Sequence, residues 1–175
     1  MSDNNQNRSL KKDSVVSCVD DIYYFERGVS SKELIHTASC VMESMTVEKG
    51  EEFTNVSDVS SFVRMKLGMS QREVFAVIFL DNKHRLIKYS ELFYGTVDSC
   101  TVHPREVVKK ALELNAKAVV LAHNHPSGNI EPSQADRDIT RKVKSALDTV
   151  DIRLLDHFVV SSLVQYCSFA ERGLL

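Results

Sequence analysis

The chain has 175 residues, of which 43% are hydrophobic and 26% are charged. These proportions are typical of a soluble globular protein, and the length suffices for one domain with a buried core. The formal net charge of -2 argues against a protein that mainly coats nucleic acid, because such domains are usually basic. The longest apolar runs, Val74–Leu80 and Ala118–Ala122, are far shorter than the ~20 residues that cross a bilayer, so no membrane association is expected.

The cysteines and the first residues indicate a cellular compartment. The opening residues are polar and contain no apolar segment of the kind found in secretory signal peptides. The four cysteines, at positions 18, 40, 100 and 167, are scattered and form no C-x-x-C pair. This spacing indicates neither a local cysteine zinc site nor a disulfide framework. We therefore expect a protein of the reducing cytoplasm whose cysteines are buried as small hydrophobic side chains.

The N-terminal third divides into a polar segment and a helical one. We expect residues 1–28 to form a flexible tail, because their few apolar groups cannot offset the entropy lost on ordering. Ser30 and Ser31 then offer a helix cap, and apolar residues follow at helical spacing. We expect residues 29–54 to form this helical lead-in, and a second helix to occupy residues 57–67.

From residue 72 onwards, strands and helices are expected to alternate. Glu73 precedes Val74–Leu80, a continuous apolar run that is typical of a buried strand. Further strands are expected at residues 85–89, 95–97, 117–122, 152–160 and 165–168, and helices at residues 104–114 and 133–149. The alternation indicates the α/β (α+β) class, with a mixed β-sheet flanked by helices, in one domain over residues 55–175.

The chemically informative stretch follows a buried strand and runs from His123 to Asp136. His123 and His125 are two positions apart on an extended chain, so their side chains project to the same side. Pro126 keeps the chain extended there, and Asp136 lies one turn into the next helix, where it can face the strand end. Two imidazoles and one carboxylate leave the fourth position of a tetrahedral zinc ion open, as in catalytic sites.

Each part of this stretch also has a simpler interpretation. Histidines at a strand end are often solvated or hydrogen-bonded, and Ser133-x-x-Asp136 fits a capping box at a helix start. Capping and metal binding are compatible, because Ser133 can cap the helix while Asp136 turns to a metal ion. The convergence of two histidines, a Pro-Gly loop and an acidic residue on one place favours the metal site.

The stretch resembles the signature of the JAMM (MPN+) metalloproteases, in which His-x-His-Pro is followed by six residues, Ser, two residues and Asp. The match holds at every position: His123, His125, Pro126, Ser133 and Asp136. Residues 123–129 resemble in particular the RadC branch, which is labelled a DNA repair protein. Shorter matches to that branch lie at residues 95–96, 104–106, 111–112 and 155–157. The resemblance covers about residues 55–175 and implies a layered fold related to that of the cytidine deaminases.

The resemblance also implies roles for individual residues. It implies three zinc ligands, with a water molecule in the fourth position: His123, His125 and Asp136. The family uses a glutamate on the first strand of the domain as general base. Glu73 matches that place, and Glu91 is the competing candidate. Ser133 would donate a hydrogen bond to the oxyanion of the tetrahedral intermediate.

Two functions follow as alternatives. We expect a zinc-dependent hydrolase of peptide or isopeptide bonds, whose peptide or protein substrate the sequence does not identify. The alternative is a non-catalytic metal-binding module that acts in DNA repair or replication through DNA or protein contacts. In the RadC branch a helix-hairpin-helix DNA-binding module precedes the metal domain, and the first 55 residues here are too short and too polar for all of it. DNA is thus a partner that neither this segment nor the net charge supports.

Two other enzyme classes fit the sequence poorly. An HNH nuclease spreads its residues over a hairpin and a helix, whereas His-Asn-His is contiguous here. A zinc deaminase needs H-x-E and P-C-x-x-C, and the sequence contains neither. The sequence carries no signal for an oligomeric state.

Several neighbouring residues have roles that the sequence leaves open. Asp156 either orients a ligand histidine or forms with His157 a buried polar pair that serves the fold. His103 and Arg105 flank a helix start and are expected to be solvated or capping, and turn formation explains Ser127. A basic run on the site helix is expected to form a solvated face rather than a nucleic-acid patch: Arg137, Arg141, Lys142 and Lys144.

Overall fold

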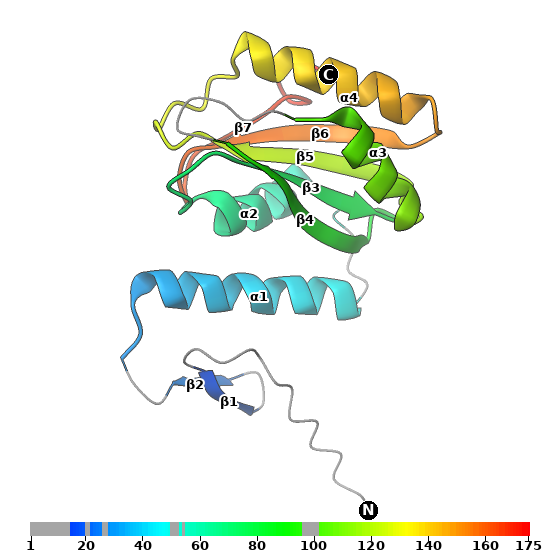
Figure 1. The fold of residues 1–175 in the computed structure, drawn as a ribbon. Helices are drawn as coiled ribbons and strands as arrows, with labels where there is room; N and C mark the ends of the chain where they lie inside the picture. Colours follow the sequence, from blue (N-terminus) through cyan, green and yellow to red (C-terminus); the bar gives the residue numbers. More distant parts are fainter. Residues whose placement is uncertain (1–14, 20–21, 26–27, 50–52, 54, 96–101) are drawn as a thin grey trace, which may run out of the picture.

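The computed structural model describes residues 15–19, 22–25, 28–49, 53, 55–95 and 102–175. A five-stranded sheet has the strand order β4-β3-β5-β6-β7 (Figure 1). Its strands are β3 (Val74–Leu80), β4 (Leu86–Tyr94), β5 (Ala118–Asn124), β6 (Arg153–Val160) and β7 (Tyr166–Ser168). The described helices are α1 (Ser31–Lys49), α2 (Val56–Leu67), α3 (Pro104–Glu113) and α4 (Gln134–Asp148). Because β5 and β6 are parallel and the other neighbours antiparallel, the sheet is mixed, as expected.

The alternation of side chains along the central strands divides the core into two layers. Even-numbered residues of β3 and β5, such as Ile78 and Val120, pack against α2. Odd-numbered residues, such as Val77 and Leu121, pack against α3 and α4 on the opposite face (Figure 1). Every residue of β3 and of β5 is buried, as expected for strands that helices cover on both sides. The predicted α/β class with helices flanking a mixed sheet is therefore confirmed.

Element boundaries differ from the expected ones at a few points. The strand β3 has the expected bounds, whereas β4 continues to Tyr94, which pairs with Val74 at the start of β3. The strand β5 continues to Asn124, so that the first histidine of the metal motif belongs to the strand itself. For the strand expected at residues 95–97, Gly95 lies outside any strand and residues 96–97 lie outside the described part of the chain.

The N-terminal region contains two strands that the sequence interpretation did not include. The strands β1 (Val15–Val19) and β2 (Ile22–Phe25) pair with each other in an antiparallel sheet of their own. They lie within residues 1–28, where we expect a flexible tail, and residues 1–14 lie outside the described part of the chain. The mobility of this region and the proposed divisions at residues 28 and 54 stay predictions.

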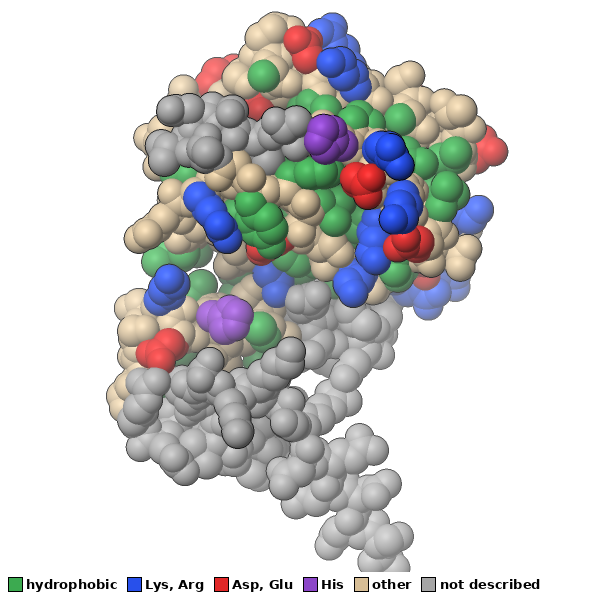
Figure 2. Space-filling model, in the orientation of Figure 1, with side chains coloured by type: hydrophobic (Ala, Val, Ile, Leu, Met, Phe, Trp, Pro, Cys, Tyr) green, Lys and Arg blue, Asp and Glu red, His purple; other side chains and the backbone are tan. Residues whose placement is uncertain are grey.

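The surface carries charges of both signs. Figure 2 shows the face on which α3 and β4 lie in front, and on it Lys and Arg side chains alternate with Asp and Glu side chains. A DNA-binding surface usually gathers basic side chains into one patch, which this face does not have among the residues described. Among those residues, too, no helix is both long enough and apolar enough to pass through a bilayer.

A close approach between α2 and the β6–β7 connection generates a stability prediction. A Cβ atom at Gly68, just after α2, would lie 2.8 Å from the backbone carbon and oxygen of Ser162. Because backbone atoms cannot yield as side chains do, Gly68→Ala should lower the free energy of unfolding by about 1–3 kcal/mol. Urea denaturation measures this change. Gly28→Ala is the matched control, since nothing lies within 4 Å of a Cβ there, and it should leave the midpoint unchanged. An unchanged urea midpoint for Gly68→Ala would contradict this prediction, because the backbone at Ser162 would then shift without cost.

Candidate metal centre

Three side chains meet where β5 ends and α4 begins. His123 Nε2 lies 3.0 Å from His125 Nε2 and 3.2 Å from Asp136 Oδ1. His125 Nε2 lies 3.5 Å from Asp136 Oδ2. In a tetrahedral zinc site with bonds of about 2.0–2.1 Å, neighbouring ligand atoms are separated by about 3.3 Å. The described residues therefore contain one group, His123, His125 and Asp136, with the spacing and chemistry to hold a metal ion.

The sheet places the two histidines. His123 is odd-numbered, so it projects to the face of α3 and α4, and only 1% of its surface is exposed. His125 follows the strand but keeps its pairing, because its backbone N–H donates to the Val160 carbonyl at 2.8 Å. The chain then turns at Gly128, whose φ of +90° lies in the left-handed region that glycine adopts without strain. The loop thereby returns towards the start of α4.

Helix capping places the third ligand. The Asp136 backbone N–H donates to Ser133 Oγ at 3.1 Å, and the Ser133 N–H and hydroxyl donate to Asp136 Oδ2 at 2.7 and 2.6 Å. The capping box and the metal group thus use the same carboxylate, and Oδ1 faces His123. Burial would raise the pKa of Asp136, but its contacts with His123, His125 and Ser133 outweigh burial and hold the pKa well below its usual range. The carboxylate is ionised, as a metal ligand must be.

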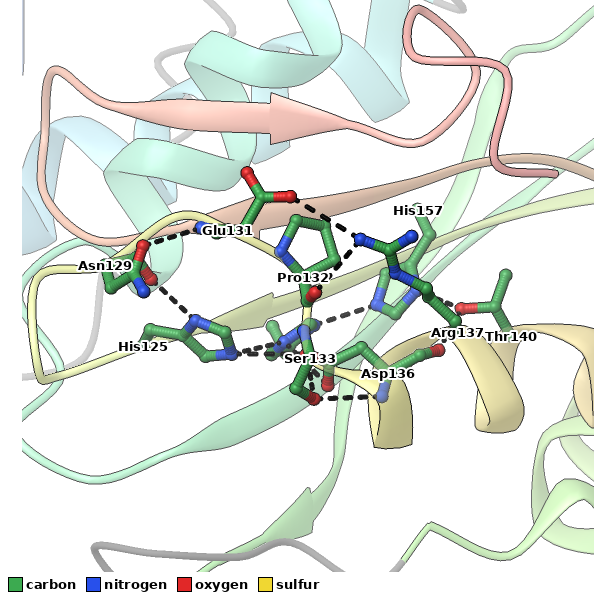
Figure 3. A network of polar contacts seen from close by, with 10 residues as sticks. His125, Asn129, Glu131, Pro132, Ser133, Asp136, Arg137, Thr140 and His157 are labelled. Carbon is green, nitrogen blue, oxygen red and sulfur yellow. Dashed lines mark hydrogen bonds and ion pairs between the residues drawn. The ribbon is translucent and has the colours of Figure 1, made fainter.

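A backbone contact orients His125. Its Nδ1 lies 2.7 Å from the Asn129 carbonyl oxygen (Figure 3). A carbonyl oxygen only accepts hydrogen bonds, so in the neutral ring Nδ1 carries the proton and Nε2 has the lone pair that a metal ion requires. Two imidazole nitrogens and one carboxylate group thus converge within 3.5 Å of one another, a donor set that can hold a metal ion.

The structure distinguishes the two candidate glutamates by position. Glu73 lines a cavity of about 680 Å³ together with His125, Ser133 and Asp136. Burial raises the pKa of Glu73, and the Asp136 carboxylate acts in the same direction, whereas the two histidines oppose it. Glu91 does not line this cavity; it lies exposed on β4, where the hydroxyl groups of Tyr89 and Tyr94 each contact it at 3.1 Å. The geometry brings Glu73, and not Glu91, to the candidate centre.

Asn124, between the two histidines, is a residue whose role the sequence interpretation missed. Alternation turns it away from the metal ligands, and it is 2% exposed. Its Oδ1 accepts from the Val74 N–H at 2.8 Å, and its Nδ2 donates to the carbonyl groups of Ser70 and Arg72 at 3.1 and 3.0 Å. Asn124 thereby fixes the chain on both sides of Glu73. A polar residue at a buried strand position was the signal in the sequence.

The two alternatives for Asp156 can now be separated. Asp156 Oδ1 accepts from the backbone N–H groups of His157 and Ala170 at 2.6 and 2.9 Å, and Oδ2 accepts from Ser168 Oγ at 2.5 Å. Asp156 therefore holds the C-terminal segment in place and serves the fold. His157, and not Asp156, contacts a ligand histidine, because its Nε2 lies 2.8 Å from His123 Nδ1.

The remaining neighbours lie mostly at the rim or away from the centre. His103 precedes α3 without capping it through its side chain, and Arg105 forms an exposed pair with Glu106 at 3.3 Å. Ser127 and Lys142 line the cavity. Two arginines of the basic run pair with nearby acids: Arg137 with Glu131, and Arg141 with Asp138. These pairings agree with a solvated helix face for that part of the run.

Comparison with known proteins places this centre in a family context. Residues 53–174 match the family model of the RadC-like JAB domain. A UPF0758 protein of Vibrio cholerae is 50% identical over 153 residues, which span 87% of this chain and 95% of that protein. A UPF0758 protein of Marinomonas sp. is 60% identical over 123 residues, which span 70% of this chain but only 54% of that protein. The chain thus spans nearly all of one relative and about half of the other, and neither name states an activity.

Metal binding by this group can be tested by removing ligands. Metal analysis of the purified protein should show about one metal ion per chain, and the His123→Ala, Asp136→Ala double variant should lose it, because one imidazole alone binds divalent ions weakly. His84→Ala, a substitution at a half-buried histidine in the turn between β3 and β4, is a control that should keep the metal. Full metal content in the double variant would refute the ligand assignment.

The three hydrogen bonds of Asn124 on the two sides of Glu73 yield a separate prediction. Asn124→Ala leaves a buried N–H and two carbonyl groups without their partner, and each such group costs about 1–3 kcal/mol. We expect a loss of at least one such amount in the free energy of unfolding, measured by urea denaturation. Asn82→Ala, in an exposed turn, should have no effect. Equal free energies of unfolding for the two variants would contradict this prediction and would show that water replaces the hydrogen bonds of Asn124.

Proposed function

The chain belongs to the RadC-like JAB domain family, and we propose that it is a zinc-dependent hydrolase of peptide or isopeptide bonds. The observation that carries the proposal is the placement of Glu73 in the same cavity as the metal-binding group. Two neutral imidazoles and one carboxylate suit zinc and leave a coordination position open. A carboxylate beside that position is the group that amide hydrolysis requires as a base.

The residues of the centre divide the proposed reaction between them. His123, His125 and Asp136 would hold the zinc ion, which when bound supplies a Lewis acid that lowers the pKa of a water molecule from ~15.7 towards ~7. Glu73 would take up a proton as water attacks the carbonyl carbon and the C–O bond forms, before the C–N bond breaks, and burial favours this role because it raises the pKa of Glu73 above that of an ordinary glutamate. Glu73 then returns the proton to the leaving amine, so the base is regenerated.

Ser133 can serve the oxyanion only after a rotation. Its hydroxyl group donates to Asp136 Oδ2, with Oγ 2.6 Å from that oxygen, and its backbone N–H donates to the same oxygen. When the hydroxyl turns towards the cavity, the backbone bond still holds Asp136. Ser133 can therefore donate to the developing oxyanion without releasing the ligand, and removing such a donor typically costs on the order of 10²-fold in rate.

The cavity fits a peptide-like substrate. Apolar side chains form part of its wall: Phe75, Val102, Pro126 and Ile139. They can contact apolar parts of a peptide, while the polar lining residues can bond to its backbone. The volume of about 680 Å³ accommodates a few residues of an extended chain.

The alternative function, a metal-binding module that acts through DNA or protein contacts, has less support. A non-catalytic site needs only its ligands, and a half-buried glutamate beside Asp136 adds repulsion that such a site would not require. The mixed charges in Figure 2 also give DNA no basic surface on that face of the described residues. We further propose the reducing cytoplasm as the location, since the described cysteines, Cys40 and Cys167, are free thiols.

The choice of base provides the test. Glu73→Gln should keep its zinc and lose about 10²–10⁴-fold in hydrolysis, because glutamine occupies the same space but cannot accept the proton. The measurement is a cleavage screen of peptides and isopeptides with the zinc-loaded protein, analysed by mass spectrometry. Glu91→Gln is the matched control and should cleave like the wild type.

Two outcomes would contradict the proposal. Loss of cleavage in Glu91→Gln and not in Glu73→Gln would transfer the base to Glu91. A wild-type protein that is fully loaded with zinc, cleaves nothing in the screen and shifts DNA in a salt-dependent manner, with Glu73→Gln doing the same, would favour the binding module.

A further inference from the structure

A chain of buried hydrogen bonds lies behind the metal ligand His123. Its Nδ1 lies 2.8 Å from His157 Nε2, and His157 Nδ1 lies 2.6 Å from Thr140 Oγ1. The Thr140 hydroxyl in turn contacts the Asp136 carbonyl oxygen at 2.6 Å (Figure 3). Thr140 and His123 are each 1% exposed, and His157 is fully buried. These buried hydrogen bonds therefore connect the side chain of His123 to the backbone of Asp136, out of reach of solvent.

When His157 is neutral, these hydrogen bonds allow only one assignment of donors and acceptors. The Asp136 carbonyl cannot donate, so the single hydroxyl hydrogen of Thr140 must point to it. Thr140 Oγ1 can then only accept, and the proton between it and His157 lies on His157 Nδ1. His157 Nε2 is thereby left as an acceptor, which requires the proton on His123 Nδ1. His123 Nε2 then has its lone pair free and directed at the metal-binding group.

The surroundings of His157 favour the neutral ring. It stacks on Phe169 with the ring centroids 4.7 Å apart, and the ring of Phe75 lies edge-on at 5.5 Å. A second proton would therefore place a charge on a fully buried ring that packs against two apolar rings, which is costly. Among the described contacts of its ring nitrogens there is no carboxylate oxygen that would pair with such a charge.

The fold explains why a side chain has this task at His123. The ring of His125 lies beside an irregular loop, where the Asn129 carbonyl is free to accept. His123 lies inside the sheet, where β3 and β6 flank its strand and use the backbone groups for pairing. On β6, His157 pairs with Leu121, two residues before His123, and so projects to the same face. Thr140 lies one helical turn after Asp136, so α4 presents both on one side.

We propose that Thr140 and His157 are positioning residues of the metal centre, which hold His123 with its proton on Nδ1 and its Nε2 towards the metal ion. The proposal rests on the zinc site of the proposed function. Without the Thr140 hydroxyl, His157 loses the acceptor for its Nδ1 proton, and both rings can exchange tautomers or rotate. Changes in such supporting hydrogen bonds typically weaken metal affinity 10- to 100-fold.

The test uses zinc affinity, measured by competition with a chromophoric chelator, in the full-length protein. Thr140→Val removes the hydroxyl at nearly constant shape and should raise the zinc Kd by about 10- to 100-fold. Thr140→Ser keeps the hydroxyl and should bind within about threefold of the wild type. Thr149→Val is the matched control, since Thr149 also bonds to a carbonyl four residues back on α4 but is exposed, and it should not change the Kd.

Two spectroscopic measurements complement the affinities, and the first of them needs no variant. In the zinc-loaded wild type, nitrogen NMR of the histidine rings should show His157 protonated at Nδ1 and unprotonated at Nε2. In the cobalt-substituted protein, the ligand-field absorption bands should shift in Thr140→Val and return in Thr140→Ser, which a merely structural role of Thr140 would not produce.

The outcomes separate this inference from the proposed function. A folded Thr140→Val variant that binds zinc as tightly as the wild type, or a His157 ring with its proton on Nε2, would overturn the inference and leave the zinc hydrolase intact. A wild-type protein that binds no zinc would overturn both together. Loss of hydrolysis in Glu73→Gln, with unchanged zinc affinity, tests the base alone and does not bear on Thr140.

Discussion

The site depends on the central position of β5 in the sheet. This strand pairs with β3 on one side and with β6 on the other, and each neighbour supplies a different part of the centre. The antiparallel partner β3 starts next to His123, which places Glu73 beside the ligands. The parallel partner β6 brings His157 behind His123. Because a strand with two neighbours cannot shift register without breaking both ladders, the relative positions of Glu73, His123 and His157 are fixed together.

Within that frame, α4 contributes both stability and chemistry through one carboxylate. A capping residue contributes typically ~1 kcal/mol to a helix, and Ser133 and Asp136 satisfy each other's backbone N–H groups. The same bonds restrict the rotation of the Asp136 carboxylate, so that Oδ1 points to His123. The ligand is oriented before any metal arrives, which reduces the entropy that metal binding must overcome. The two interpretations of this motif in the sequence are therefore parts of one arrangement.

The sequence sufficed to predict those features that local spacing encodes. The apolar run of β3, the alternation that puts His123 and His125 on one side, and the turn of helix before Asp136 are all properties of neighbouring residues. The contacts made by Asn124 and His157 are not, because they join residues 50 and 34 positions apart. Only the pairing of β5 with β3 and β6 brings them together. A polar side chain within an apolar strand marked both residues, but it did not identify their partners.

The same reasoning applies to two features that the sequence left open or did not reveal. Asp156 has the residue type that usually supports a metal-bound histidine, but β7 and the turn after it lie closer, and their donors occupy both of its oxygens. The strands β1 and β2 pair with each other in a sheet of their own, and the sequence pattern did not reveal this pairing. In both cases the contacts between separate segments, which composition does not reveal, determine the structure.

The arrangement of carboxylates bears on whether the centre is catalytic. Burial and the nearby Asp136 both raise the pKa of Glu73, which means that its ionised form is disfavoured where it lies. A site that only fastened the fold would gain from an apolar residue at this position, since the unfavourable charge would disappear. A divalent cation held by His123, His125 and Asp136 would reverse that balance, because its charge would stabilise both carboxylates. The half-buried position of Glu73 at the same cavity as His125 and Asp136 is the position that the proposed proton acceptor requires.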